Sequence, residues 1–478
     1  MTVRRIEHPS VADRKAIGKD AREHTPLTAH LGWVPAPDRA DPVALLEEQN
    51  VTRDQDLVPV RHGRMLVSPF TFYRGAAKIM AADLKDTPRA GLISQLCGDA
   101  HLSNFGVFAS PERQLMFDLN DFDETLPGPF EYDVKRLCAS ITIAARNNGF
   151  TAPEVHEVTL AAVRAYREAM RDFAKMRVMD IWYAHLSEDE LIKSLDLARD
   201  GEKSKAQKRV VDQVEKNTRR TAAKARTRDS LQALSKLAEY VDGNYRIVSQ
   251  PPIVIPLREL EDLVGLNAQQ TRDAVHEQLR SYRETLQDDR RHLLERFQII
   301  DVARKVVGVG SVGTRAYIAL LEGRDQQDPL FLQVKEATAS VLEDHLPKSR
   351  YSQPGERVVQ GQRMMQAASD IYLGWTKGVH EGRFLYWRQL RDMKGSADVE
   401  SMRPFTLTFY GRECAWTLAR AHARSGDPVA MGAYLGKTDA FDLGIADFSR
   451  RYADQNEKDY EAFAEAVRSG RLEAVEGV

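Results

Sequence analysis

Two short apolar segments, Leu92–Cys97 and Leu115–Leu119, are each followed by a cluster of polar residues. Their length and apolar composition predict two buried strands. The polar side chains are Asp99, His101 and Asn104 after the first strand, and Asp121, Asp123 and Glu124 after the second. Carboxylate and amide oxygens are the ligands that a hard divalent cation such as Mg²⁺ prefers. A turn that only caps its own backbone needs one or two such residues, so we expect a metal-binding loop here.

The spacing of these residues narrows the chemistry. Asp99 and Asn104 are five positions apart. In protein kinases an Asp accepts the proton of the substrate hydroxyl, and an Asn five positions later binds Mg²⁺. Asp121 comes 17 positions after Asn104, far enough for a strand hairpin to bring the two together. The arrangement is typical of a phosphoryl-transfer loop.

A glycine-rich segment lies about 200 residues further along the chain. Gly308, Gly310, Ser311 and Gly313 belong to a G-x-G-x-x-G pattern. A dinucleotide-binding fold requires a helix at the third glycine, but here the pattern predicts strands before and after it. Strand, glycine loop and strand form the hairpin that covers the phosphates of a nucleotide in kinases. Glycine lets the backbone approach phosphates that a side chain would block.

The next predicted strand, Phe331–Lys335, ends in a lysine. It resembles the kinase strand whose Lys contacts the nucleotide phosphates and pairs with a Glu on the following helix. Glu356 is the first candidate for that partner, and Glu343 and Glu336 are the alternatives. A hairpin then ends at Trp387–Leu390 and resembles the kinase hinge, where the backbone of Gln389 and Leu390 would meet adenine.

The first cluster, Gly98-Asp99-x-His101-x-x-Asn104, resembles the catalytic loop of aminoglycoside phosphotransferases and choline kinases. The resemblance implies that Asp99 is the general base and that Asn104 and Asp121 bind Mg²⁺. It also implies that Asp133 braces the loop. Cys97 stands where that group has a histidine. The choice of metal ligand among Asp118, Asp121 and Asp123 stays open, and the spacing favours Asp121, with Asp123 as a further ligand.

The whole chain is also similar to a bacterial family, domain of unknown function 2252. The resemblance rests on Ser68-Pro69-Phe70, Arg74-Gly75, CGDAHLSNFG, NDFDE, the glycine hairpin and the segments at Gln362 and Arg391. The family name implies no substrate. Arg74 is a candidate catalytic residue that would bind phosphate, as would the Arg391 and Lys394 pair. All three could equally form salt bridges or helix caps.

The order of the clusters is the reverse of that in kinases, because the catalytic loop precedes the glycine loop. The predicted helix Leu407–Ala423 resembles the one that normally leads into the catalytic loop. We therefore expect an α+β, two-lobed, protein-kinase-like fold that is circularly permuted and carries a large helical insertion. Two unrelated domains are the alternative. Permutation is tolerated where termini and joins lie at the surface.

The hydrophobic periodicity divides the chain into five segments. We expect an N-terminal arm (1–60), a catalytic core with both acidic loops (61–180), a helical region (181–300), a nucleotide-binding β-rich lobe with the hinge (301–395) and C-terminal helices (396–478). Residues 152–300 have an almost entirely helical pattern, which Pro251-Pro252 breaks before a short extended piece at residues 253–257. Within them Lys203–Arg228 is rich in Lys and Arg, which predicts a solvated helix face or a basic binding surface. Continuous helices are expected over Ser68–Leu84 and Pro354–Ser369.

Composition excludes several classes of protein. The net charge of −2 provides no global attraction for nucleic acid or anionic lipid. The three cysteines are far apart, which argues against a disulfide framework and fits a reducing cytosol. Neither a signal peptide nor an apolar run of the roughly 20 residues that span a bilayer is present in the sequence. We expect a cytoplasmic protein with no membrane or nucleic-acid partner and leave its oligomeric state open.

These features together predict an enzyme that uses ATP and Mg²⁺ to phosphorylate a hydroxyl group. Nucleotidyl transfer on the same scaffold stays open. A metal-dependent phosphoesterase is the second hypothesis, because Gly98-Asp99-x-His101 also resembles the first motif of those enzymes, although the His-rich segments they require are missing from the sequence. A non-catalytic nucleotide-binding regulator is the third. The acceptor is not identified, and its pocket is expected within residues 150–300.

Overall fold

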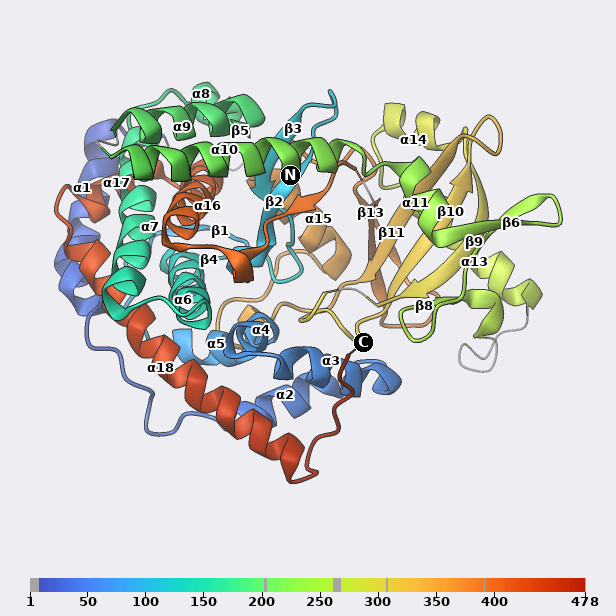
Figure 1. Cartoon of the computed structure of the whole chain (residues 1–478), viewed down its shortest axis with the longest axis horizontal. Coiled ribbons are helices and arrows are strands. Elements are labelled where there is room, and N and C mark those ends of the chain that lie inside the picture. The colour runs from blue at the N-terminus through green and yellow to red at the C-terminus, as the bar shows by residue number, and fades with distance from the viewer. Residues whose placement is uncertain (1–7, 202–203, 261–267, 307, 391, 478) are drawn as a thin grey trace.

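The computed structural model describes residues 8–201, 204–260, 268–306, 308–390 and 392–477. A large helical body lies beside a twisted antiparallel sheet, and short helices from the N-terminal segment run below them (Figure 1). The α+β class expected from the sequence is confirmed.

The helical body is formed by segments from both halves of the chain. Its helices are α1 (Val11–His24), α6 (Glu131–Asn147), α7 (Ala152–Phe173), α8 (Val178–Tyr183), α9 (Glu188–Gly201), α10 (Lys205–Arg226), α16 (Pro404–Ser425), α17 (Pro428–Leu435) and α18 (Ala440–Arg468). α6 is central, with a continuous run of buried residues over 131–145. α7 begins at a capping box, in which Thr151 and Glu154 satisfy each other's backbone amides. Helices distant in sequence therefore share one core.

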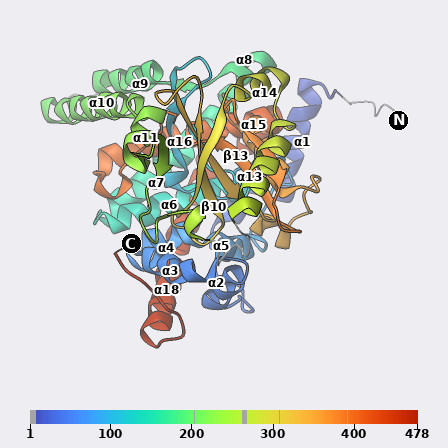
Figure 2. The same ribbon diagram turned by 90° about the vertical axis from the view of Figure 1, so that its right-hand side faces the viewer.

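The main sheet has six antiparallel strands in the order β12-β13-β11-β10-β9-β8. They are β8 (Val254–Pro256), β9 (Gln298–Lys305), β10 (Ala316–Glu322), β11 (Pro329–Glu336), β12 (Gly374–Lys377) and β13 (Phe384–Gln389). α13 (Ala268–Arg283) and α14 (Asp288–Leu294) cover its outer face (Figure 2). There Tyr282 stacks on Trp387 with ring centroids 4.6 Å apart. α15 (Pro354–Met365) packs between this sheet and α16.

Smaller sheets support the loops that carry the polar clusters. One has the order β14-β2-β3-β5, from β2 (Phe105–Ala109), β3 (Leu115–Leu119), β5 (Leu186–Ser187) and β14 (Gly395–Ser396). β1 (Ile93–Leu96) pairs with β4 (Leu126–Pro129), and β6 (Ala238–Val241) with β7 (Asn244–Ile247). The other helices are α2 (Pro42–Asn50), α3 (Val58–Leu66), α4 (Pro69–Gly75), α5 (Ala77–Leu84) and α11 (Ser230–Leu237). Single 3₁₀ turns are η1 (Leu27–His30), η2 (Gln55–Leu57), η3 (Leu102–Asn104), η4 (Leu257–Glu259), η5 (Val341–Asp344) and η6 (Val399–Ser401).

Three local expectations are wrong. Residues 152–300 contain β5, β6, β7 and the start of β9 in addition to β8, which lies in the expected extended piece, so this region is not almost entirely helical. The helix expected over Ser68–Leu84 divides into α4 and α5 at Ala76, whose backbone leaves the helical region. α15 ends at Met365, because Gln366 is extended and its side-chain amide donates to the Leu119 carbonyl. At Gln366 the contact that replaces the helix is with Leu119, which is distant in sequence, so local periodicity cannot predict it.

A buried ion pair joins β3 to α16. The Arg420 guanidinium donates to Asp118 and to the Met365 carbonyl. Asp118 also accepts from the Leu119 and Ala367 amides at 2.8 and 2.9 Å. Both side chains are 1% exposed. The pair therefore fixes the strand before the second acidic loop against the helical body.

Within the described part of the chain, none of the helices is long and apolar enough to cross a membrane.

Replacement of Arg420 by Met is expected to destabilise the fold. It leaves the buried Asp118 carboxylate without its ionic partner, at a cost of about 3 to 5 kcal/mol. Arg450→Met is the control, because Arg450 is half-exposed and pairs only at the surface, so a loss within about 0.5 kcal/mol is expected. Urea unfolding measures both, and equal losses would contradict the bracing role of Arg420.

Candidate functional site

The two polar clusters of the sequence meet at Lys335. Its ammonium lies 2.5 Å from Asp123 Oδ2 and 3.7 Å from Asp121 Oδ2. Asp123 and Lys335 are 212 positions apart in the chain. The Tyr386 hydroxyl donates to the other oxygen of Asp123 at 2.6 Å. Tyr386 is opposite Lys335 in the β11–β13 register, so the pairing of these strands delivers both groups to one carboxylate.

Burial and nearby charges shift the pKa values of Asp121 and Asp123 in opposite directions. Burial and the neighbouring Asp123 charge raise the pKa of Asp121. Burial acts the same way on Asp123, but the Lys335 ammonium and the Tyr386 hydrogen bond outweigh it, so the pKa of Asp123 is lowered. Burial alone would lower the pKa of Lys335, but the two carboxylates raise it. Lys335 is therefore a charged ammonium, although its side chain is only 2% exposed.

The loop that carries Asp99 is held by α6. The Asp133 carboxylate accepts from the Cys97 and Gly98 amides at 2.7 and 3.0 Å. Gly98 has φ of +84°, which favours glycine, and a Cβ there would lie 2.1 Å from the Glu124 carbonyl oxygen. The Asn104 amide donates to the Asp99 carbonyl at 2.6 Å. These contacts close the loop on itself and against the second acidic segment.

The Asp99 carboxylate faces three basic side chains. Arg136 Nε donates to Asp99 Oδ1 at 2.7 Å, and His101 Nε2 lies 3.7 Å from Oδ2. Burial raises the pKa of Asp99, while Arg136 and Arg74 oppose that shift. Burial lowers the pKa of His101, so its ring is neutral. Arg74 Nε is buried and has no hydrogen-bond partner among the described residues.

The glycine-rich loop contacts Asp123 through Ser311, and residues of the N-terminal segment bind the backbone of the same loop. The Ser311 hydroxyl donates to Asp123 Oδ2 at 3.4 Å. On the other side, the Asp54 amide donates to the Gly313 carbonyl at 2.8 Å, and Arg64 donates to the Gly308 carbonyl at 2.5 Å. A Cβ on Gly310 would lie 3.0 Å from the Arg74 carbonyl oxygen. The close approach at Gly310 is therefore to the protein's own backbone.

The expectation that a glutamate pairs with Lys335 is not met, since its ionic partners are the two aspartates. Glu356 lies at the start of α15, where its amide bonds to Gln353, on the side of the sheet next to β12. Glu343 accepts hydrogen bonds from the Ser340 and Ser349 backbone amides. Glu336 accepts from the Arg315 and Arg383 guanidinium groups.

The expected hinge residues lie at the end of β13. The Gln389 amide donates to Asp370 at 2.5 Å, and the Leu390 amide donates to the Phe331 carbonyl at 2.9 Å. Both backbone donors are therefore used within the protein. Contact of Gln389 and Leu390 with adenine stays a prediction. Arg391 lies outside the described residues, and Lys394 lies near Asp121, Arg388 and Lys335.

Sequence reasoning missed Tyr386, Arg388 and Arg136. Tyr386 and Arg388 alternate on one face of β13, and Arg388 donates to the Asn120 carbonyl at 3.0 Å. Arg136 lies one turn after Asp133 on α6, so both point toward the Asp99 loop. The sequence could have indicated these residues through periodicity. Arg136 shares a helix face with Asp133, but Tyr386 and Arg388 could be selected only once the strand that pairs with Lys335 was known.

The carboxylates beside Lys335 have the ligand chemistry that Mg²⁺ uses when it also binds phosphate. Among the described residues, no group of three or more His, Cys, Asp and Glu side chains could hold a metal ion. Mg²⁺ needs only one or two carboxylates when phosphate oxygens complete its shell. Asp121, Asp123 and Asn104 offer oxygens of the required kind. Asp118 does not, because its carboxylate is bonded to Arg420 and two backbone amides.

Residues 53–466 match the model of a family described as an uncharacterized protein conserved in bacteria (DUF2252), and the chain belongs to this family. The matched range contains the acidic loops, the glycine loop and Lys335. Neither a curated protein nor a solved structure matches the chain.

Alanine at Gly98 is expected to cost more stability than alanine at Gly91. Both glycines have positive φ, of +84° and +74°, but a Cβ on Gly91 meets nothing within 4 Å. Gly91→Ala should therefore cost only the backbone penalty of about 1 kcal/mol. Gly98→Ala should cost at least about 2 kcal/mol more, because the Glu124 backbone must move. Denaturant unfolding gives both values, and similar losses would show that the close packing of the two loops is unimportant.

Proposed function

We propose that this member of the DUF2252 family is an ATP- and Mg²⁺-dependent phosphotransferase that acts on a hydroxyl group. The main support for this proposal is the contact of Lys335 with Asp123 and Asp121 next to a glycine-rich loop. A buried ammonium, paired strand-end carboxylates and a glycine loop are the parts that position a nucleotide triphosphate in kinases.

Lys335 and the oxygen-bearing side chains near it have different roles in this proposal. Lys335 orients the phosphates, and Asn104, Asp121 and Asp123 would hold Mg²⁺. The metal would supply positive charge to the phosphoryl oxygens. Lys335 bonds to Asp123 in this structure, so Lys335 would have to share its ammonium between this carboxylate and the phosphates of a bound nucleotide.

Asp99 is the proposed general base. Burial raises the pKa of Asp99, which improves its match to a hydroxyl proton near neutral pH. Arg136 holds one carboxylate oxygen through its Nε and leaves the other on the side of the neutral His101 ring. Arg74 is the candidate to meet the transferred phosphoryl group, because its Nε has no hydrogen-bond partner among the described residues.

We also propose that the fold is kinase-like with its segments in permuted order. In support, the six-stranded sheet carries the glycine loop and Lys335, whereas the helical body carries the Asp99 loop. α16 runs beside that loop, where His422 Nε2 lies 3.2 Å from the carboxylate of Asp133. In this proposal α16 corresponds to the kinase helix that enters the catalytic loop, although it comes some 300 residues later in this chain.

The function is tested by thermal shift with ATP, with and without Mg²⁺, followed by incubation with cell extract and ATP labelled at the α or γ phosphate. We expect stabilisation by ATP and metal together and transfer of the γ label only. Transfer of the α label would indicate nucleotidyl transfer. Binding without any transfer would favour a regulator, and phosphate release from esters without ATP would favour a phosphoesterase.

Asp99→Asn is expected to abolish turnover and leave ATP binding within about twofold. The amide keeps the shape of the carboxylate but cannot accept the proton, so transfer should fall about 100- to 10,000-fold. Calorimetric titration with ATP and a γ-label transfer assay measure the two effects. Asp86→Asn, at an exposed site, is the control. Unchanged turnover in Asp99→Asn would remove Asp99 from the mechanism.

Lys394→Met is expected to change the pH dependence of ATP binding. Burial and the nearby Arg388 lower the pKa of Lys394 to about 7, so its ammonium is charged below that pH and neutral above it. The variant should bind ATP about tenfold more weakly than the wild type near pH 6, and the difference should shrink as the pH rises past about 8. Titrations across this range measure it, with the exposed Lys85→Met as control. A constant difference would contradict a titrating contact.

A further inference from the structure

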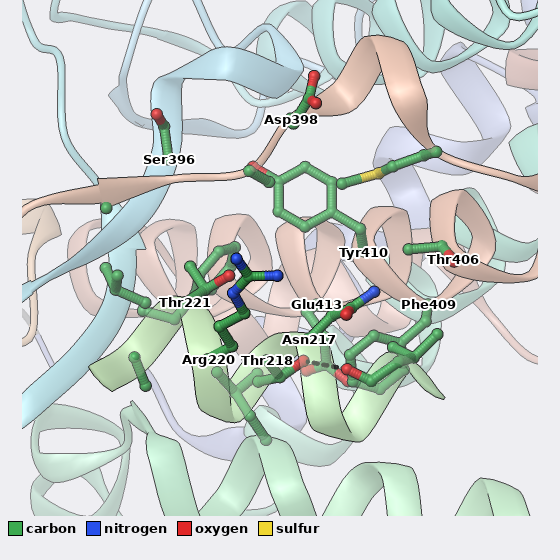
Figure 3. Close-up of a pocket in the computed structure, with 18 of the residues that line it drawn as sticks. Asn217, Thr218, Arg220, Thr221, Ser396, Asp398, Thr406, Phe409, Tyr410 and Glu413 are labelled. Atoms are coloured by element: carbon green, nitrogen blue, oxygen red, sulfur yellow. Dashed lines mark hydrogen bonds between the residues drawn. The ribbon is translucent and has the colours of Figure 1, made fainter. Parts of the chain in front are cut away.

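A cavity of about 810 Å³ lies between α10, α16, the β2–β3 hairpin and the stretch 395–403 (Figure 3). It contains none of the residues assigned above to phosphoryl transfer. Its floor is apolar and includes Val107, Phe117 and Phe409. The Tyr410 ring forms part of the wall, and its hydroxyl donates to the Leu102 and Phe105 carbonyls at 3.0 and 3.1 Å. The cavity thus shares Tyr410 with the segment that carries Asn104.

The charges around the cavity are unbalanced. Four cationic side chains line it and have no hydrogen bond or ion pair among the described residues: Arg209, Arg220, Lys224 and Arg403. Three acids also line it. Glu188 is paired with Arg226, burial raises the pKa of Glu413 to about 7, and the Asp398 carboxylate has no hydrogen bond or ion pair among the described residues, so the unpaired cations outnumber the unpaired acids. An anionic group would therefore find unpaired positive charge here.

Arg220 is the best placed of these cations. Its side chain extends from α10 into the cavity toward Tyr410, with Asn217 and Thr218 beside it on the same helix (Figure 3). The neighbouring Arg219 differs, because it pairs with Glu215 at 2.9 Å and does not line the cavity. The two arginines form a matched pair for experiment.

The stretch 395–403 connects the cavity with the candidate active site along the chain. Gly395 pairs with Val107 in the sheet, directly after Lys394. Asp398 and Ser401 line the cavity, whereas the Glu400 carboxylate between them acts on the charge of Arg74. One short segment of chain thus lines the cavity and also lies within electrostatic range of Arg74, the side chain proposed to meet the transferred phosphoryl group.

We propose that this cavity binds the acceptor, a small amphipathic molecule that carries an anionic group held by Arg220 and a hydroxyl group. The apolar floor takes its hydrocarbon part. The assignment of the ligand as acceptor rests on the proposed phosphotransferase function, whereas the preference for an anionic amphiphile does not.

Binding of anilinonaphthalene sulfonate tests the pocket without any assumption about catalysis. The probe combines aromatic rings with a sulfonate. Arg220→Gln should weaken its binding to the folded chain at least about fivefold, because a charged hydrogen bond is lost. Asn217→Trp, which fills the cavity, should also weaken it, and Arg219→Gln should not. Equal effects of Arg219→Gln and Arg220→Gln, or none from Asn217→Trp, would overturn the pocket assignment.

A transfer assay tests the identity of the ligand as acceptor. Small molecules from cell extract are separated by anion exchange and incubated with γ-labelled ATP. We expect label in the retained fraction and, for Arg220→Gln, a KM for that fraction raised at least about fivefold with ATP affinity unchanged. Label confined to the unretained fraction would overturn the anionic acceptor. Probe binding that depends on Arg220, without transfer by the wild type to any fraction, would overturn the phosphotransferase and leave the anion pocket in place.

Discussion

The contact of Lys335 with Asp123 joins the six-stranded sheet to the acidic loop after β3, with the Lys335 side chain 2% exposed and the Asp123 side chain 29% exposed. Removal of an ammonium and a carboxylate from water costs several kcal/mol for each ion, and the cost is offset only where geometry and further hydrogen bonds are good. Tyr386 and Ser311 supply such bonds to Asp123. The register of β11 with β13, the glycine turn and the position of the acidic loop must therefore agree. That agreement places groups suited to a phosphate and a metal on one side of the sheet.

The N-terminal segment does more than wrap the outside of the fold, because it binds the glycine-rich loop. Arg53 donates to the Val312 carbonyl, and Asp54 both bonds to Gly313 and pairs with Arg315 at 3.0 Å. A glycine loop without such contacts would lose more conformational freedom on binding a ligand. Here the loop is already ordered, and the segment that orders it leads directly to the helix that carries Arg74.

Local patterns in the sequence were sufficient to predict the strands at Ile93, Leu115 and Ala316, the hairpin of β12 and β13, and the grouping of acids after β3. They were also sufficient to single out Lys335, because a lysine at the end of a strand after a glycine hairpin is distinctive. They could not predict the partner of Lys335, because the choice between Glu356 and Asp123 depends on how distant segments pack. The same reason explains Asp118, which resembles a metal ligand in sequence but is paired with Arg420 in the fold. The breaks at Ala76 and Met365 likewise follow from tertiary contacts.

The bracing of the early loops by α16 has a consequence for biosynthesis. Asp118 and Asp133 leave the ribosome about 300 residues before Arg420 and His422, the side chains that face them in the folded chain. Until Arg420 is synthesised, the Asp118 carboxylate, which is buried in the folded chain, has no ionic partner. The strand before the second acidic loop therefore gains its ionic partner only near the end of translation, and a fragment cut before α16 would lack the Arg420 contact that fixes β3.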